Sequence, residues 1–408
     1  MNTRPILDSD KGPFVLSVSL NADNSCFSAA LETGFRVFSS KTCEQMVARG
    51  TYNQRVCSGC TDIIIEVGGG IGCAEMLGTT SYIALVGGGK QPKFPQNKVC
   101  PPEDSGWQLI NKTDIVYEVQ IWNDNTKVVT TALEFKTPVQ RVRISQTHLV
   151  VVQLNKVGIY KMKVPPEKLA EYETANNPYG LCALGKGTVA FPGRAIGQVK
   201  LYDVNTGNVS IIPAHDGPLR ALALSSNGEM AATASEQGTI IRLWSFPSCT
   251  KLGEFRRGVD PAAIFSLAFS PSGSTLAVTS DKSTLHIYDL NNTQTADPKK
   301  HKYGILSKVP LLPRQFSDTY PTASVKFEMG EEPTNWGPHM KSATLGAGIP
   351  GVPGGRPTKG LLGWLDDNTV LILGAGQDAR WERFSIVIEE DTGKKVLAPY
   401  GWKRYLDD

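Results

Sequence analysis

Two stretches of the chain, ALALSSNGEMAATASEQGTIIRLWSF at 221–246 and SLAFSPSGSTLAVTSDKSTLHIYDL at 266–290, share one layout. Each contains three strand-like runs separated by short polar turns, SNG and EQG in the first stretch and PSG and DKS in the second. Gly, Ser, Asn and Asp in such clusters end strands and form tight turns. The segment SVSLNADNSCFSAALETGFRVFSS at 17–40 has the same layout. The repeated unit is therefore expected to be a small antiparallel sheet.

An aromatic residue marks the end of each unit and sets the period of the repeat. From Trp122 to Tyr288 these marks are 38 to 44 residues apart, and the first and last gaps, 84 and 96 residues, leave room for insertions. A period of about 40–45 residues is typical of four-stranded WD40-type blades. We predict an all-β chain, a single seven-bladed β-propeller over residues 1–408, closed radially so that few strand edges stay exposed. The marks are Phe38, Trp122, Tyr160, Tyr202, Trp244, Tyr288 and, more weakly, Phe384.

Three segments depart from the blade pattern. Residues 99–120 are expected to be an insertion in blade 2, and 291–322 a long loop of blade 6. Residues 330–359, which include LGAGIPGVPGGRP, are expected to be a flexible Gly/Pro-rich linker before the last blade, without core-forming residues. Val-Cys, Thr-Asp and the final Gln of 99–120 can all be encoded by the signals of a short fungal intron. Retained intron sequence is therefore an alternative to a genuine insertion.

Composition narrows the function classes. A net charge of +3 on 408 residues does not indicate a nucleic-acid partner. The N-terminus has no basic stretch followed by an apolar one, so no signal peptide is expected, and no apolar run approaches the roughly 18 residues of a spanning helix. The eight cysteines are scattered, and Cys57-x-x-Cys60 lacks a second pair. We therefore expect a cytoplasmic protein with reduced cysteines, in peripheral contact with membranes.

Two glycine-rich motifs fail as nucleotide sites. GGGIGC at 68–73 lacks the dinucleotide spacing, and VGGGKQP at 86–92 has Gln91 where a P-loop needs Ser or Thr. The five histidines show no metal-ligand spacing. We expect no enzyme, no cofactor and no metal.

The FRRG motif lies between two repeats. Successive side chains of an extended segment point to opposite faces, so Arg256 should face the preceding blade and Arg257 the following one. Guanidinium groups suit phosphate oxygens, and hydroxyl and imidazole side chains flank the motif on both sides. These residues predict two anion sites; the alternative is that the hydroxyls belong to blade turns and that His215 makes an intrablade hydrogen bond. The flanking residues are His215, Ser235, Thr239 and Arg242 on one side and Ser280, Thr284 and His286 on the other.

FRRG between these two blades, with AFPGRAIGQVKLYDV (190–204), IPAHDGPL (212–219) and LVGGGKQPKFPQNKV (85–99), resembles the PROPPINs, the WD-repeat propellers that bind phosphoinositides in autophagy. The chain looks most like their small fungal SVP-one-like branch. The resemblance implies phosphatidylinositol 3-phosphate and phosphatidylinositol 3,5-bisphosphate as ligands. Ser283 replaces Gly238 in the second repeat, so the two sites should differ. Site one is implied at His215, Ser235, Gly238, Thr239, Arg242 and Arg256, and site two at Arg257, Ser280, Thr284 and His286.

The resemblance also places a membrane loop at 291–322. Its segment KKHKYGILSKVPLLPRQF combines basic residues with Leu311, Leu312 and Phe316, a mixture suited to an anionic interface. The alternative is a loop folded back on the propeller. The expected function is lipid-binding on vacuolar, endosomal or pre-autophagosomal membranes, in autophagy, vacuolar traffic or protein transport. The implied partner is a large autophagy lipid-transfer protein, bound through loops of blade 2 or 3. A protein-only WD40 scaffold, with FRRG as a structural seam, is the alternative function.

Overall fold

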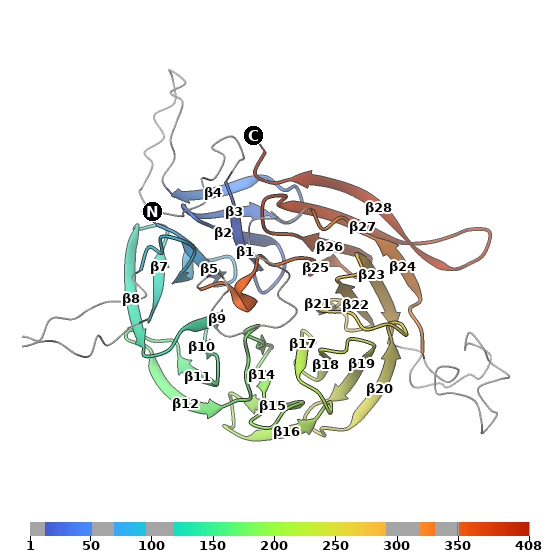
Figure 1. Cartoon of the computed structure of the whole chain (residues 1–408), viewed down its shortest axis with the longest axis horizontal. Coiled ribbons are helices and arrows are strands. Elements are labelled where there is room, and N and C mark those ends of the chain that lie inside the picture. Colours follow the sequence, from blue (N-terminus) through green and yellow to red (C-terminus); the bar gives the residue numbers. More distant parts are fainter. Residues whose placement is uncertain are drawn as a thin grey trace, which may run out of the picture.

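The computed structural model describes residues 13–50, 69–94, 117–290, 319–330, 349 and 351–407. In this part of the chain the strands form seven sheets of four, and each sheet contains four strands that follow one another in the sequence. The sheets are arranged radially around a centre (Figure 1). The predicted all-β, seven-bladed propeller is confirmed.

Each blade runs from an innermost to an outermost strand, with antiparallel pairing throughout. The bounds of the first four blades are β1 (Val15–Leu20), β2 (Cys26–Leu31), β3 (Gly34–Ser39) and β4 (Gln45–Gly50); β5 (Ile71–Met76), β6 (Tyr82–Gly87), β7 (Tyr117–Asn123) and β8 (Val128–Phe135); β9 (Val139–Ile144), β10 (His148–Gln153), β11 (Lys156–Lys161) and β12 (Glu167–Glu173); and β13 (Ala183–Leu184), β14 (Thr188–Pro192), β15 (Gln198–Asp203) and β16 (Val209–Pro213).

The remaining blades carry the FRRG motif and the C-terminal end. Their bounds are β17 (Leu219–Leu224), β18 (Met230–Ser235), β19 (Ile240–Ser245) and β20 (Lys251–Arg256) in blade 5; β21 (Ile264–Phe269), β22 (Thr275–Ser280), β23 (Thr284–Asp289) and β24 (Ala323–Lys326) in blade 6; and β25 (Leu361–Asp366), β26 (Thr369–Leu373), β27 (Arg380–Ile388) and β28 (Lys395–Arg404) in blade 7.

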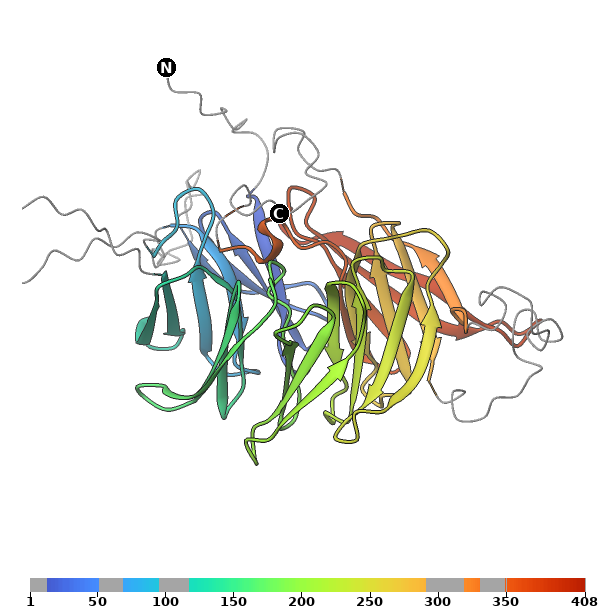
Figure 2. The ribbon, with the colours of Figure 1, turned by 60° about the horizontal axis from the view of Figure 1, so that its bottom comes forward.

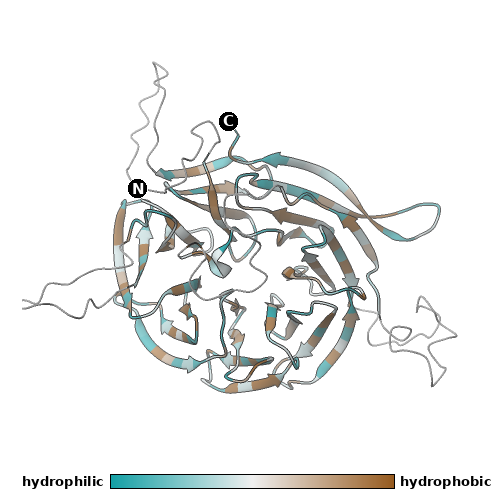
Figure 3. Cartoon of the chain, viewed as in Figure 1, coloured by the Kyte–Doolittle hydropathy of each residue, from teal (hydrophilic) through white to brown (hydrophobic). Residues whose placement is uncertain are grey.

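Burial within a blade falls from the inner to the outer strands. β22 is buried along its whole length, whereas β16 and β8 alternate between exposed and less exposed residues. Figure 3 shows the corresponding alternation of hydrophilic and hydrophobic residues along the outer strands. The outer strand therefore packs one face on the neighbouring blade and leaves the other to solvent, as its period of two requires.

The hydrophobic core lies between successive blades. Phe255 of β20 is fully buried and packs with Ile264 of β21 and Tyr288 of β23, joining blades 5 and 6. The ring closes between the first and last blades, where Val15 forms a bridge with Gly376 and packs with Leu373. Closure by such interfaces fixes the angle between blades, and so fixes the seams in which side chains from two blades meet.

The Gly/Pro-rich segment before blade 7 differs from the prediction in its described residues. Ile349 and Val352 are buried and pack on Leu16 of β1, and the short 3-10 helix η5 (Pro353–Gly355) follows. This segment lies near the centre of the propeller, at one end of it (Figures 1 and 2). The expectation that 330–359 contributes nothing to a core is wrong for this part, because its two branched side chains are enclosed by the inner strands.

Two other predicted departures are partly described. Tyr117–Gln120, expected to lie in the insertion, belong to β7 and pair with β8, and Val119 and Gln120 also pair with β6. They are therefore part of the blade, and residues 99–116 lie outside the described residues. Of the predicted loop 291–322, only 319–322 are described, and Leu311, Leu312 and Phe316 lie outside them. Across the described ranges, the structure contains no helix with the length and apolarity that spanning a bilayer requires.

Candidate anion-binding sites

The FRRG motif ends the outermost strand of blade 5. Phe255 points into the core toward blade 6, so alternation along β20 turns Arg256 and Glu254 to the opposite face. Arg256 is the last residue of the strand and pairs with Ile240, the first residue of β19. Its backbone N–H donates to the carbonyl of Thr319 at 2.9 Å, and its own carbonyl accepts from the Tyr288 hydroxyl at 3.2 Å. The backbone at Arg256 is therefore fixed by blade 6, while the strand directs its side chain to the seam with blade 4.

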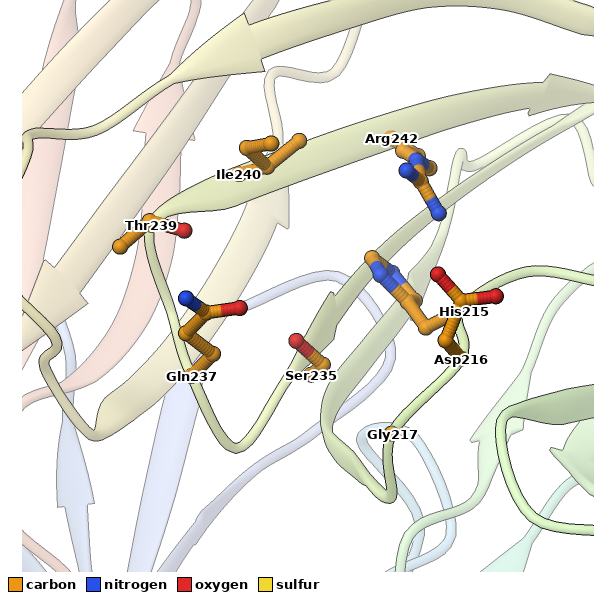
Figure 4. A pocket seen from close by; sticks show the side chains of 8 residues that line it. All are labelled: His215, Asp216, Gly217, Ser235, Gln237, Thr239, Ile240 and Arg242. Carbon is orange, nitrogen blue, oxygen red and sulfur yellow. The ribbon is translucent and has the colours of Figure 1, made fainter.

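A small polar pocket of about 80 Å³ lies on this face of blade 5. Arg242 extends from β19 toward His215, which comes from the linker before β17 (Figure 4). The pocket brings together four residues of the predicted site one: His215, Ser235, Thr239 and Arg242. It also includes four residues that the sequence analysis missed, each within two positions of a predicted one: Asp216, Gly217, Gln237 and Ile240.

Arg242 is held by two acceptors at the pocket wall. Its Nη1 donates to the carbonyl of Ala214 at 2.7 Å, and its Nε donates to Oε2 of Glu254 at 2.9 Å. Glu254 lies directly opposite Arg242 in the strand pairing, which explains the contact. The guanidinium group is thus oriented by the blade, and Glu254 offsets part of its charge.

His215 combines a structural contact with a place at the pocket. Its Nε2 lies 3.0 Å from the hydroxyl of Thr233, which also accepts from the indole of Trp244 at 3.1 Å. The intrablade hydrogen bond considered from the sequence is therefore present. Only Nδ1 remains for a ligand. Burial and the nearby charge of Arg242 lower the pKa of His215 to about 4, so the imidazole is neutral at pH 7.

Arg256 and Gly238 do not line the pocket, although the resemblance placed both in site one. Gly238 follows the turn after β18. Its φ is +61°, and a Cβ there would collide with the carbonyl oxygen of Ala262. The carbonyl of Gly238 accepts a hydrogen bond from Nε of Arg257 at 2.8 Å, and a second guanidinium nitrogen of Arg257 donates to the carbonyl of Asp260. Gly238 therefore connects the turn of blade 5 to the second arginine.

Three of the predicted site-two residues lie on neighbouring strands of blade 6, and Arg257 lies in the linker before that blade. Nδ1 of His286 lies 2.7 Å from the hydroxyl of Ser324 on β24, and the hydroxyls of Ser280 and Thr284 are 3.3 Å apart. Burial and the charge of Arg257 lower the pKa of His286 to about 4. Arg257 thus acts electrostatically on His286.

The turns of the two blades correspond despite their different sequences. Gly238 and Ser283 both have a left-handed backbone conformation, with φ values of +61° and +54°. The N–H of Gly238 donates to the carbonyl of Ser235 at 3.0 Å, and the N–H of Ser283 donates to the carbonyl of Ser280 at 3.1 Å. The serine in blade 6 keeps the turn conformation, so the backbone of the two turns does not provide the predicted difference between the sites. Among the described residues, no cluster of His, Cys, Asp and Glu could hold a metal ion.

The PROPPIN family model matches residues 117–319. The chain is 48% identical over 342 residues to the SVP1-like protein 2 of Emericella nidulans, covering 81% of this chain and 99% of that protein. It is 38% identical to the SVP1-like protein 2 of Neurospora crassa, with 99% of both chains covered.

Solved structures show the same fold. Hsv2 of Kluyveromyces lactis matches with a TM-score of 0.67 and 20% identity, covering 96% of this chain and 99% of that one. The KlAtg21 propeller, solved in complex with the coiled coil of AgAtg16, matches with a TM-score of 0.61 and 17% identity, covering 96% and 99%. On the strength of the curated relatives, the chain belongs to the PROPPIN family of β-propellers, in its SVP1-like branch.

Proposed function

We propose that this protein is a non-enzymatic reader of membrane phosphoinositides, binding phosphatidylinositol 3-phosphate and phosphatidylinositol 3,5-bisphosphate at two seams flanking FRRG. The protein would dock on vacuolar, endosomal or pre-autophagosomal membranes in autophagy or vacuolar traffic. Membership of the PROPPIN family supports the general class of function. The identity of the lipids and of the binding residues goes beyond family membership and is argued from the side chains at the two seams.

One observation carries the proposal: two successive seams present similar polar sets. In the first, a linker residue (His215), a turn hydroxyl (Ser235) and a strand cation (Arg242) line one pocket. In the second, Arg257 comes from the linker, Ser280 from the turn and His286 from the corresponding strand. A structural seam alone does not require the same arrangement of donors twice.

Hydrogen-bond donors dominate both sets, which suits a phosphate. A guanidinium group can give two parallel hydrogen bonds to phosphate oxygens, and hydroxyl groups add further donors. Asp216 is the unfavourable member of the first pocket, because its carboxylate repels an anion. It is exposed, so solvent weakens this repulsion.

Two sites on one rigid propeller should give tighter binding to a membrane than to a free headgroup. After the first headgroup is bound, the second lipid is met at high local concentration on the same surface. The loop 291–322, with its basic and apolar residues, would add contact with the bilayer. Loops of blade 2 or 3 are the proposed contact for a large autophagy lipid-transfer protein.

Liposome flotation tests the proposal. Wild-type protein should float with vesicles that contain phosphatidylinositol 3-phosphate and remain unbound with vesicles that contain unphosphorylated phosphatidylinositol. The double variant Arg256→Thr/Arg257→Thr should lose flotation while keeping its melting temperature within a few degrees. Equal flotation of the wild-type protein with both kinds of vesicle, or flotation with neither, would instead support the protein-only WD40 scaffold.

A further inference from the structure

The last residue of the outer strand occupies an equivalent position in every blade. It pairs with the first residue of the neighbouring strand: Arg256 with Ile240 in blade 5, and Lys326 with Thr284 in blade 6. Residues directly opposite in an antiparallel pair have Cβ atoms about 4.5–5.5 Å apart. Lys326 therefore lies beside Thr284, a predicted site-two residue, just as Arg256 lies beside the turn of site one.

The direction of Lys326 follows from its strand. Ser324 and Lys326 are two residues apart on β24 and lie on the same face. Ser324 contacts His286 on this face, and His286 responds to the charge of Arg257. Val325 and Ala323 turn the other way, to the core with blade 7. Lys326 thus shares the blade 5–6 seam with the residues of site two.

A cation at this position distinguishes blades 5 to 7 from the others. In the first four blades the position is occupied by Gly50, Phe135, Glu173 and Pro213. Blade 7 has Arg404, but Asp378 binds it at 2.7 Å and also binds Arg380, its strand partner, at 2.8 Å. Among the described residues Lys326 makes no ion pair, and it is exposed. Blade 7 neutralises its cation internally, whereas blade 6 leaves Lys326 available.

The strand that pairs with the outer strand shows the same contrast between blades 5 and 6 and blade 7, at its third residue. It is Arg242 in blade 5, His286 in blade 6 and Glu382 in blade 7. Glu382 is 8% exposed and accepts the N–H of Glu328 at 3.2 Å, so the blade 6–7 seam contains a buried carboxyl group. Arginine or histidine beside an end-of-strand cation suits an anion, and glutamate does not.

We infer that Lys326 is a binding residue of the second site and contacts a phosphate of an inositol-phosphate headgroup there. The inference rests on the proposed function and deepens it. Each site then has one imidazole and two permanent cations: His215, Arg242 and Arg256 in the first, and His286, Arg257 and Lys326 in the second. The two sites differ in the residue of the outer strand that lies opposite Arg242 or His286. This residue is Glu254 in blade 5 and Ser324 in blade 6.

The test is calorimetry with soluble short-chain phosphatidylinositol 3-phosphate. Wild-type protein should bind two equivalents. Arg256→Thr should leave one site, and Lys326→Gln in that background should weaken the remaining site by about tenfold or more. Lys326→Arg should retain binding, because it keeps the charge. The control for net charge is Lys168→Gln, which removes an exposed lysine, ion-paired with Glu171, from the outer strand of blade 3.

The outcomes separate this inference from the proposed function. If Arg256→Thr/Lys326→Gln binds as tightly as Arg256→Thr, the assignment of Lys326 is wrong while the two-site function stands. An equal loss with Lys168→Gln would show that only net charge matters, and would also overturn the assignment. If Arg256→Thr/Arg257→Thr still binds two equivalents, the proposed function itself fails. A single-site loss with Lys326→Gln in the otherwise wild-type chain would support the inference independently of Arg256.

Discussion

Arg242 and Glu254 face each other across the two outer strands of blade 5, joined by a 2.9 Å hydrogen bond from Nε to Oε2. Their side chains are 24% and 28% exposed, so the pair is partly screened. Such pairs contribute about 0.2–1 kcal/mol to stability. The pair matters more for binding, because the carboxylate offsets the charge that an anion would meet in site one.

We predict that Glu254→Gln increases the affinity of site one for soluble phosphatidylinositol 3-phosphate. The gain should be about two- to fivefold, the equivalent of about 0.5–1 kcal/mol. Titration of the Arg257→Thr background, in which site one is the remaining site, would measure it. Glu173→Gln is the control, since Glu173 pairs with Arg194 in the open, with side chains 73% and 82% exposed. An affinity that falls in Glu254→Gln would show that Glu254 serves mainly to position Arg242.

The two adjacent arginines should act separately. Arg256→Thr is expected to remove one equivalent of soluble headgroup in calorimetry, and Arg257→Thr the other, because their side chains serve different seams. Each single variant should float weakly with vesicles. The double variant should bind neither vesicles nor the soluble headgroup. Complete loss of headgroup binding in either single variant with an intact fold would mean that the arginines share one pocket.

The apolar side chains of the predicted membrane loop should contribute to binding of vesicles only, and not to binding of the soluble headgroup. Replacing Leu311, Leu312 and Phe316 by serine removes apolar groups worth at most about 1.5–3 kcal/mol each when fully buried. Vesicle flotation should weaken, and calorimetry with soluble headgroup should be unchanged. Equal losses in both measurements would indicate that the loop belongs to a binding pocket or to the fold.

Gly238 should tolerate no side chain, whereas Ser283 should accept change. A left-handed backbone costs a residue with a Cβ roughly 1–2 kcal/mol, and at Gly238 the Cβ would also meet the carbonyl of Ala262. We expect Gly238→Ala to lower the melting temperature clearly. Ser283→Gly is the matched variant in blade 6, and it should be neutral or stabilising. Comparable effects of both substitutions would contradict the steric argument.

Two titratable groups, one partly buried and one buried, should give opposite dependences of stability on pH. The folded state holds the pKa of His286 near 4, below its ordinary 6.5, so its contribution to stability is present above pH 6.5 and is lost as pH falls toward 4. Burial raises the pKa of Glu382 from 4.5 to about 7, so its contribution is present below pH 4.5 and is lost as pH rises through 7.

Thermal melts of two variants would check these signs. Relative to wild type, His286→Gln should gain melting temperature as pH falls from 7 to 5, and Glu382→Gln should gain it as pH rises from 5 to 8. Glutamine keeps a hydrogen-bonding amide but does not titrate in this range. Parallel curves for variant and wild type would mean that folding does not shift the pKa of either group.

The local pattern of this sequence was sufficient to predict the repeated unit. Apolar alternation between polar turns specifies a strand, and a regular aromatic mark specifies the period, so blades 3 to 6 could be located from residues alone. The pattern also placed His215, Ser235, Thr239 and Arg242 together, because they lie on successive elements of one unit. What it could not show was burial between distant segments, such as Val352 against Leu16.

Tertiary structure decided which side chains from distant parts of the chain lie beside one another. Strand register places Glu254 opposite Arg242 and Ser324 opposite His286. A polar outer strand has no hydrophobic pattern strong enough to predict this register from the sequence. Lys326 lies 69 residues after Arg257 in the chain, yet radial closure and the pairing of β24 bring it to the same seam. The sequence alone determined the blade and its arginine motif, whereas the packing of one blade on the next determined the composition of each site.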